Sequence, residues 1–300
     1  MKEQKRTGLI TAAFGRHFEV AQPDGAPLKC STRGKKNDFA CGDTVDYLPN
    51  GNGQGVIVHL HPRQNLLWRS DAFREKRIAA NLSCVVIVVA VEPGFSDRLI
   101  SRCIAAAESQ HIRPLIVLNK TDIPEGLQTA RHRLQLFDRL GYEIIALSAK
   151  NDASTLKTRL QGEHSLLVGQ SGMGKSTLIN TLIPDASAAT REISEALDSG
   201  KHTTTFARLY FLNGESWLID SPGLQVFGLA HLTPEQLAES FIEFRPALGQ
   251  CRFRNCRHIS EPGCAVVKAV ENGAIDQRRY EHFCVINNEI DRAKTLNPGW

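Results

Sequence analysis

The chain has 300 residues, of which 42% are hydrophobic and 23% are charged, and its formal net charge at pH 7 is +4. This composition is typical of a folded chain of about two domains, and it excludes collagen-like, mucin-like and largely disordered chains. The longest apolar run, Cys84–Val91, is far shorter than the ~20 residues of a membrane-spanning helix. Because no apolar segment follows the basic start, we expect a cytoplasmic protein without a membrane partner.

Residues 7–60 alternate short β-like runs with turn signals. The runs are Thr7–Ala13, His17–Ala21, Pro27–Ser31, Asp43–Leu48 and Gln54–Leu60. Five short strands predict an OB-fold-like β-barrel over residues 1–65, although an SH3-like barrel would give nearly the same pattern.

The excess of positive charge lies in this first region. The first 40 residues hold eight Lys or Arg against four Asp or Glu. Four of these basic residues could form a nucleic-acid-binding face: Lys29, Arg33, Lys35 and Lys36. The asymmetry indicates a nucleic-acid partner, while a solvated surface explains the charge alone equally well.

From Leu82 the pattern changes to apolar strands that alternate with helices. The predicted strands are Cys84–Val91, Pro114–Leu118, Glu143–Leu147, Ser165–Val168, Phe206–Leu212 and Ser216–Ile219. The predicted helices are Asp97–Gln110, Gly126–Leu140 and Ser154–Leu160. This alternation predicts an α/β domain with a parallel sheet over residues 66–230. The Pro/Gly-rich stretch 49–55 and the segment around 61–80 are predicted to be mobile joints.

The strongest motif follows the predicted strand Ser165–Val168 and precedes a helical pattern. It matches the P-loop pattern GxxxxGK[ST] and consists of Gly169, Gln170, Ser171, Gly172, Met173, Gly174, Lys175, Ser176 and Thr177. Glycines let backbone N–H groups and the next helix N-terminus approach phosphate closely. Lys175 would reach the β- and γ-phosphates, and the Ser176 hydroxyl would bind Mg²⁺.

The residues that would select the base follow the strand Pro114–Leu118. They are Asn119, Lys120, Thr121 and Asp122. The Asp122 carboxylate can accept hydrogen bonds from guanine N1–H and the exocyclic amine, whereas adenine would leave that charge unpaired. Asn119 would hold the N7 side of the base, and Lys120 would lie along the ring. Backbone N–H for guanine O6 would come from the loop Ser148, Ala149 and Lys150.

Two further segments would sense the γ-phosphate. Asp220, at the end of a predicted strand, would hold Mg²⁺ through water, and the Gly223 N–H would contact the γ-phosphate. Upstream, Thr204 is predicted to bind Mg²⁺ and the γ-phosphate, with Thr203 and Thr205 as alternatives. Both segments are therefore candidate switches.

The water that attacks the γ-phosphate needs a residue to orient it. Ras-like enzymes place a glutamine after the glycine of the second switch, but Leu224 stands there in this chain. His202, beside the switch threonines, is the candidate replacement, and the alternative is an exposed loop histidine. Since no arginine finger is identifiable, we expect slow basal turnover that accelerates when a partner orders the switches.

The order of these motifs differs from that of an ordinary GTPase. The base-selecting residues at 119–122 and 148–150 precede the P-loop, and Asp220 comes after it. This order is a circular permutation, which is tolerable because the termini of a domain often lie close together. The former ends would be joined by residues 150–164, and the new end would fall just after the second switch.

After Gly228 the strand pattern stops, which predicts a C-terminal helical domain over residues 231–300. The helical patterns cover Pro234–Phe244, with Thr233 as N-cap, and residues 265–272 and 276–294. Between them lie three thiols and an imidazole, a complete tetrahedral set for one structural Zn²⁺: Cys251, Cys256, His258 and Cys264. The metal would fix three arginines among them outward, where they could pair with RNA phosphates, although a solvated surface explains them equally well: Arg252, Arg254 and Arg257.

Together these features resemble the RsgA (YjeQ) family of circularly permuted ribosome-assembly GTPases. The resemblance covers the barrel-like start, the permuted motifs and the CxxxxCxHxxxxxC cluster. It implies a GTPase that binds the small ribosomal subunit and its rRNA, is stimulated by the subunit, and uses hydrolysis to time its release in late maturation. We also expect a monomer.

Two other functions stay open on the residues alone. One is an rRNA-binding module of barrel and zinc domain, in which GTP is a stabilising ligand with little turnover. The other is a P-loop enzyme that uses ATP, against which Asp122 argues.

Overall fold

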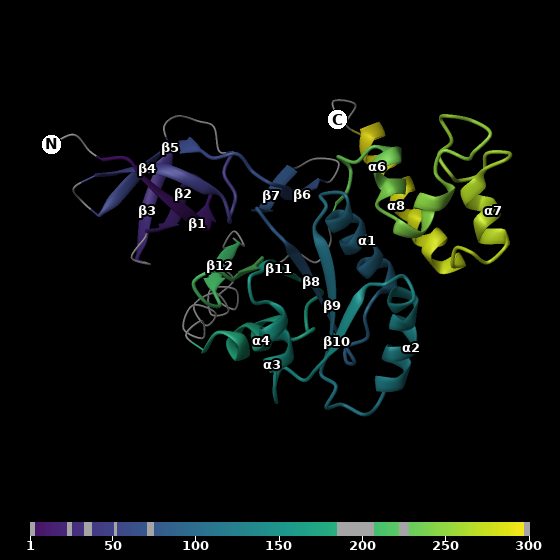
Figure 1. Cartoon of the computed structure of the whole chain (residues 1–300), viewed down its shortest axis with the longest axis horizontal. Coiled ribbons are helices and arrows are strands. Elements are labelled where there is room, and N and C mark those ends of the chain that lie inside the picture. The colour runs from purple at the N-terminus through teal and green to yellow at the C-terminus, as the bar shows by residue number, and fades with distance from the viewer. Residues whose placement is uncertain are drawn as a thin grey trace.

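The computed structural model describes residues 4–22, 26–32, 38–50, 53–70, 75–184, 207–221 and 228–296. Figure 1 shows a small β-barrel at the N-terminal end, a central α/β domain, and a group of helices at the C-terminal end. This is the multidomain fold that the sequence predicts.

The barrel consists of five strands. They are β1 (Arg6–Phe14), β2 (His17–Ala21), β3 (Pro27–Thr32), β4 (Thr44–Asn50) and β5 (Gln54–Leu60). Their order is β1-β2-β3-β5-β4, and β4 pairs back with β1, so the sheet closes on itself. Alternate side chains fill the interior, among them Phe18, Val20 and Tyr47, each at most 1% exposed. The closed order is that of an OB-fold and favours it over the SH3-like alternative.

The central sheet is parallel except at one edge. Its strands are β8 (Cys84–Ala90), β9 (Arg113–Asn119), β10 (Glu143–Ala146), β11 (His164–Val168), β12 (Arg208–Phe211) and β13 (Trp217–Asp220). The order is β10-β9-β8-β11-β13-β12, and only β12 runs antiparallel to its neighbour. The tight turn at Asn213 joins β12 to β13, because the Asn213 side chain accepts hydrogen bonds from the backbone N–H groups of Glu215 and Ser216.

Helices cover both faces of this sheet. They are α1 (Asp97–Glu108), α2 (Leu127–Asp138), α3 (Ser154–Arg159) and α4 (Lys175–Leu182). Figure 1 shows α1 and α2 on one side and α3 and α4 on the other. Strand β8 is buried along its whole length, as expected for an apolar strand between two helical layers.

The segment 61–80 differs from the predicted joint. It contains two strands, β6 (Leu66–Ser70) and β7 (Glu75–Ala80), which pair antiparallel as a separate small sheet. The Trp68 ring lies 4.8 Å from the ring of His231, which follows the second candidate switch in sequence. The sequence of β6 and β7 lacks a clear alternation of apolar and polar residues. A contact with His231, far away in sequence, thus supports this hairpin.

The C-terminal part contains α6 (Pro234–Glu239), the 3-10 helix η2 (Ile242–Ala247), α7 (Ala265–Glu271) and α8 (Gln277–Leu296). Thr233 caps α6 as predicted, with the reciprocal bonds of a capping box to Gln236. The single helix predicted over Pro234–Phe244 is instead two, because Phe241 adopts an extended backbone between them. Its buried ring packs with Phe244 and Phe283.

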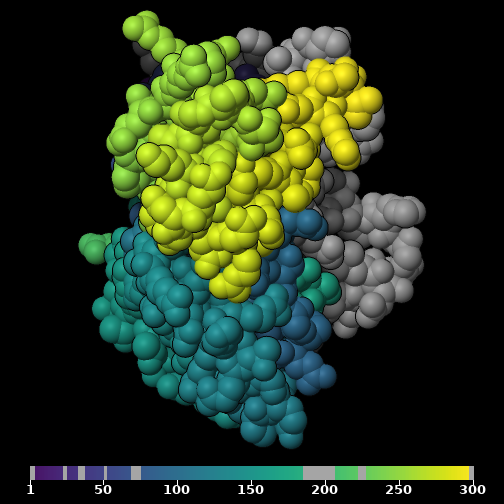
Figure 2. Space-filling model, turned by 90° about the vertical axis from the view of Figure 1, so that its right-hand side faces the viewer, coloured from purple at the N-terminus to yellow at the C-terminus, as the bar shows by residue number. Residues whose placement is uncertain are grey.

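This C-terminal part packs firmly on the central domain, as Figure 2 shows. Arg279 of α8 is completely buried and donates to Glu243 of η2, within the C-terminal part, at 2.6 Å. Its guanidinium also lies 5.8 Å from the ring of Phe137 in α2. Arg102 of α1 pairs with Glu289 of α8. Ion pairs and apolar packing therefore join the two parts.

Within the described residues, no helix combines the length and the apolar character of a membrane-spanning segment.

Candidate nucleotide site and metal centre

The P-loop leaves the end of β11 in a conformation that requires glycine. Gly169 has a φ of 152°, and a Cβ at this position would lie 2.3 Å from the carbonyl oxygen of Val88. The backbone can therefore turn tightly over the end of β8 and enter α4. Lys175, the first residue of α4, donates from Nζ to the carbonyl oxygens of Gly169 at 2.6 Å and Gln170 at 2.8 Å. The ammonium group thus lies inside the loop that would hold the phosphates.

Asn119 brings the three predicted nucleotide-binding loops together. This side chain, only 2% exposed, donates from Nδ2 to the carbonyl oxygen of Met173 in the P-loop at 2.9 Å. Its Oδ1 accepts from the backbone N–H of Lys120 at 2.8 Å and of Ala149 at 2.9 Å. Residues that are 54 positions apart in sequence are therefore adjacent in the fold. In this arrangement, the Asn119 amide and the Ala149 N–H make protein contacts; their contacts with guanine remain predictions.

Asp122 lies at the exposed edge of this arrangement. The Ser148 hydroxyl lowers the pKa of the Asp122 carboxyl below its ordinary value, and the positive charges of Lys150 and Lys120 act in the same direction. The carboxylate is therefore ionised at neutral pH and accessible. Those are the two properties that a hydrogen-bond acceptor for the guanine edge needs.

Asp220 ends β13 and is buried, 8% exposed. Burial raises the pKa of its carboxyl to about 6, while the charge of Lys175 acts against this rise. Its Oδ1 has no hydrogen-bond partner among the described residues. A buried carboxylate oxygen without a partner, close to the P-loop lysine, is suited to accept a hydrogen bond from a water molecule that binds Mg²⁺. The hydroxyl of Ser176 is exposed and could supply a direct ligand.

The remaining predicted switch residues lie outside the described part of the chain. These are His202, Thr203, Thr204, Thr205, Gly223 and Leu224. Their roles therefore stay predictions from sequence.

Two supports of the site have no motif that could have revealed them. Thr181 of α4 donates from its hydroxyl to the carbonyl oxygen of Ala149 at 2.7 Å, which holds the 148–150 loop against the P-loop helix. Lys120 donates from Nζ to the carbonyl oxygen of Glu92 at 2.7 Å. Both contacts join segments far apart in sequence, so only the fold shows them.

Replacing Gly174 with alanine should weaken nucleotide binding. Gly174 has a φ of 86°, and a Cβ there would lie 2.4 Å from Nδ2 of Asn119. Left-handed strain of roughly 1–2 kcal/mol, together with a displaced Asn119, should lower GDP affinity at least about tenfold. Fluorescent GDP titration measures this. The matched control is Gly162→Ala, where φ is 73° but nothing lies within 4 Å of the added Cβ. Equal GDP affinity in the two variants would contradict the proposed role of the Asn119 contact.

The four predicted zinc ligands come together in the C-terminal part. Their ligand atoms all lie within 4.8 Å of one another. Nδ1 of His258 is 3.5 Å from Sγ of Cys251 and 3.6 Å from Sγ of Cys264, and those two sulfurs are 4.0 Å apart. Tetrahedral Zn²⁺ with bonds of about 2.3 Å to sulfur and about 2.0 Å to nitrogen implies separations of roughly 3.8 Å and 3.5 Å. These three separations therefore fit Zn²⁺, and with four protein ligands the cluster leaves no open position.

Backbone N–H groups surround this cluster. Ala265 N–H donates to Sγ of Cys251 at 3.3 Å, and Val267 N–H donates to Sγ of Cys264 at 3.4 Å. Glu261 accepts from several backbone N–H groups of the same loop. Although burial opposes this effect, these bonds lower the pKa of the Glu261 carboxyl to about 2. The two N–H donors to sulfur orient the ligands and stabilise thiolates, and the Glu261 bonds hold the loop that carries them.

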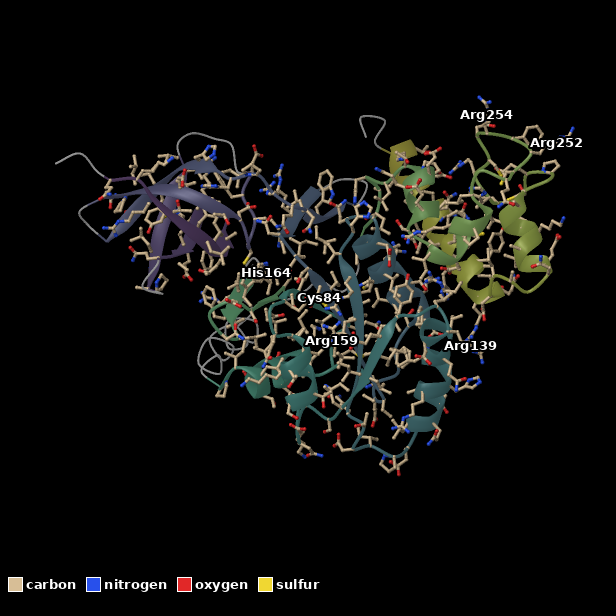
Figure 3. The ribbon with its side chains drawn as sticks, viewed as in Figure 1. Cys84, Arg139, Arg159, His164, Arg252 and Arg254 are labelled. Carbon is tan, nitrogen blue, oxygen red and sulfur yellow. The ribbon has the colours of Figure 1, made fainter. Side chains whose placement is uncertain are left out.

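One of the three arginines between the zinc ligands is not free for RNA. Arg257 forms a two-oxygen ion pair with Asp291 of α8 at 2.6 Å and also contacts Asn287. It therefore fastens the zinc loop to α8, because α8 carries a carboxylate opposite it. Arg252 and Arg254 are exposed, as expected, and Figure 3 shows them at the outer end of this part.

Comparison with known proteins identifies close relatives over nearly the whole chain. The family model described as RsgA GTPase matches residues 60–230. A curated protein of Paraburkholderia phymatum named small ribosomal subunit biogenesis GTPase RsgA is 54% identical over 291 residues, which are 95% of this chain and 92% of that protein. A protein of the same name from Nitrosospira multiformis is 52% identical over 276 residues, which are 92% of this chain and 88% of that protein.

Two solved structures are similar to this chain in fold over nearly its whole length. YjeQ from Thermotoga maritima superposes with a TM-score of 0.74 at 30% identity, over 96% of this chain and 99% of that one. YloQ, described as a circularly permuted GTPase, has a TM-score of 0.70 at 26% identity, over 96% of each chain.

Proposed function

This chain belongs to the RsgA family of GTPases, and from that membership we propose that it hydrolyses GTP on the small ribosomal subunit during late maturation of that particle. The observation that carries the nucleotide part is the hydrogen bond from Asn119 to Met173, which unites the guanine-selecting loop and the phosphate loop. The ribosomal part rests on the shared name of the relatives.

We assign the work to three domains, at residues 1–65, 66–230 and 231–300. The barrel and the zinc domain would contact rRNA through exposed basic residues such as Lys29, Arg252 and Arg254. Cation–phosphate contacts of this kind should weaken as the salt concentration rises. The protein would act as a monomer in the cytoplasm. Arg33, Lys35 and Lys36 belong to the proposed RNA face of the barrel but lie outside the described residues.

In the proposed mechanism, the P-loop N–H groups bind the phosphates, and Asp122 accepts the two donors of the guanine edge. Lys175 exchanges its loop carbonyls for the β- and γ-phosphate oxygens. Ser176, Thr204 and, through water, Asp220 would hold Mg²⁺, which neutralises charge on those oxygens when bound. The Gly223 N–H would detect the γ-phosphate, so hydrolysis would release the segment that leads to His231 and α6.

His202 would orient the attacking water once the subunit orders its loop. We expect His202→Ala to lower subunit-stimulated turnover about 100-fold, within the range of positioned acid–base groups, and to leave GDP affinity nearly unchanged. The measurement is phosphate release with and without purified small subunits. His132→Ala, an exposed histidine on α2, is the control. A stimulated rate near that of the unaltered protein would remove this assignment.

Phosphate release, combined with co-sedimentation with small subunits, distinguishes the proposed enzyme from an rRNA-binding module that uses GTP as a stabilising ligand. Stimulated turnover, together with stronger co-sedimentation in a non-hydrolysable GTP analogue than in GDP, supports the enzyme. Subunit binding without turnover would support the module, which the GTPase names of the relatives do not favour.

A further inference from the structure

The loop between the first two zinc ligands is held rigidly and displays an aromatic ring. Phe253 is 44% exposed, although its neighbours Cys251 and Cys256 are anchored in the cluster. Arg252 N–H donates to the carbonyl oxygen of Gly263 at 3.1 Å, and Cys256 N–H donates to that of Phe253 at 3.3 Å. The ring is therefore presented to solvent by a fixed backbone, so little conformational entropy is lost when it binds a partner.

Two arginines flank Phe253 in sequence, and one of them contacts its ring. The Arg252 guanidinium lies 5.4 Å from the centroid of the Phe253 ring, and the side chain of Arg254 follows on the other side in sequence. Within the described residues, neither arginine forms an ion pair with a carboxylate, in contrast to Arg257. Figure 3 shows Arg252 and Arg254 at the outer end of the zinc-binding part, directed away from the rest of the chain. Their charges are therefore available to an anionic partner.

A cleft of about 280 Å³ opens beside the ring. Phe253 and Arg254 line its outer part, and two carboxylates of α6, Glu235 and Glu239, also line it. Its inner wall is the zinc cluster itself, through Cys251, Cys256 and His258. Hydrogen bonds, first among them one from its own backbone N–H, lower the pKa of the Glu235 carboxyl, so that this group is charged. These carboxylates would repel an acidic side chain that entered the cleft. A nucleobase brings amino donors that a carboxylate accepts, and its phosphates would meet the arginines.

We propose that Phe253 is a stacking platform for one unpaired RNA base, with Arg252 and Arg254 binding the flanking phosphates and the α6 carboxylates accepting from the base edge. Single-stranded RNA is recognised in this way, by bases stacked on aromatic rings in a basic setting. This proposal rests on the proposed function and specifies which chemical feature of rRNA the zinc-binding part contacts.

The test uses the full zinc-loaded chain and a fluorescent single-stranded RNA. Phe253→Leu keeps an apolar side chain but removes the ring, and it should weaken RNA binding about 5- to 150-fold, the range for loss of one stacked base. The matched control is Phe211→Leu, since Phe211 is also 44% exposed but lies in β12 of the central domain. Zinc content and thermal melting establish that each variant is folded. Phe253→Trp should bind at least as tightly as the unaltered chain.

An RNA with abasic sites provides the decisive comparison. It should bind the unaltered chain as weakly as normal RNA binds Phe253→Leu, and the substitution should then cause no further loss. Equal losses in Phe253→Leu and Phe211→Leu, or binding of an acidic peptide that competes with RNA, would overturn the stacking site. Subunit-stimulated GTP turnover by the unaltered chain is measured separately, so failure of the stacking site and failure of the proposed GTPase function are distinguishable.

Discussion

Asp122→Asn is expected to change the base preference from guanosine to xanthosine nucleotides. An asparagine amide presents donors where the carboxylate accepted the guanine N1–H and exocyclic amine, whereas xanthine offers an oxygen at that position. Two hydrogen bonds to a charged acceptor contribute roughly 1.5–3 kcal/mol each, so GDP affinity should fall about 10²- to 10⁴-fold. Titrations with fluorescent guanosine and xanthosine diphosphates measure both affinities.

The structure makes this substitution easy to interpret. Asp122 is exposed and the amide of Asn119, rather than Asp122, holds the loops together, so the fold should survive the change. Asp138→Asn, at the exposed end of α2, controls for the loss of one negative charge. If the Asp122 variant kept its GDP affinity, the base would lie elsewhere and Asp122 would have no part in selection.

Removal of zinc is the other change with a large expected effect. The loop that contains Cys251, Cys256, His258 and Cys264 has little regular structure before α7, and its four ligand atoms lie within 4.8 Å of one another. Binding of structural Zn²⁺ contributes about 10–16 kcal/mol in small zinc peptides, so without the metal this loop should unfold. The loss should be local, because α8 remains attached to the central domain through the Arg102–Glu289 ion pair and the contact of Arg279 with the Phe137 ring.

Chelation should therefore lower the melting temperature and expose the loop amides to hydrogen exchange, while those of β8 and β9 stay protected. Cys256→Ser should reproduce the effect without chelator. The control is Cys284→Ser, which removes a thiol of α8 that is outside the metal cluster. A chelated protein with unchanged circular dichroism and melting would rule out a structural role for the metal.

Several elements of this chain could be predicted from local patterns. The apolar run of β8, the capping residue Thr233 and the glycines of the P-loop have causes that act within a few residues: burial on two faces, satisfaction of free N–H groups, and freedom at positive φ. Their positions agree with the structure within a few residues. The hairpin β6–β7 could not be predicted in this way, because the contact between Trp68 and His231 joins residues that are far apart in the chain.

By itself, the sequence determined the chemistry of the sites: the kind of loop that binds phosphate, the carboxylate suited to guanine and the four ligands suited to zinc. Only the tertiary structure decided which side chains are free to use that chemistry. It joined Asn119 to Met173, paired Arg257 with Asp291 and left Arg252, Phe253 and Arg254 at the surface. The physical reason is that the residue type determines which bonds a side chain can form, whereas long-range packing determines which partner lies within bonding distance.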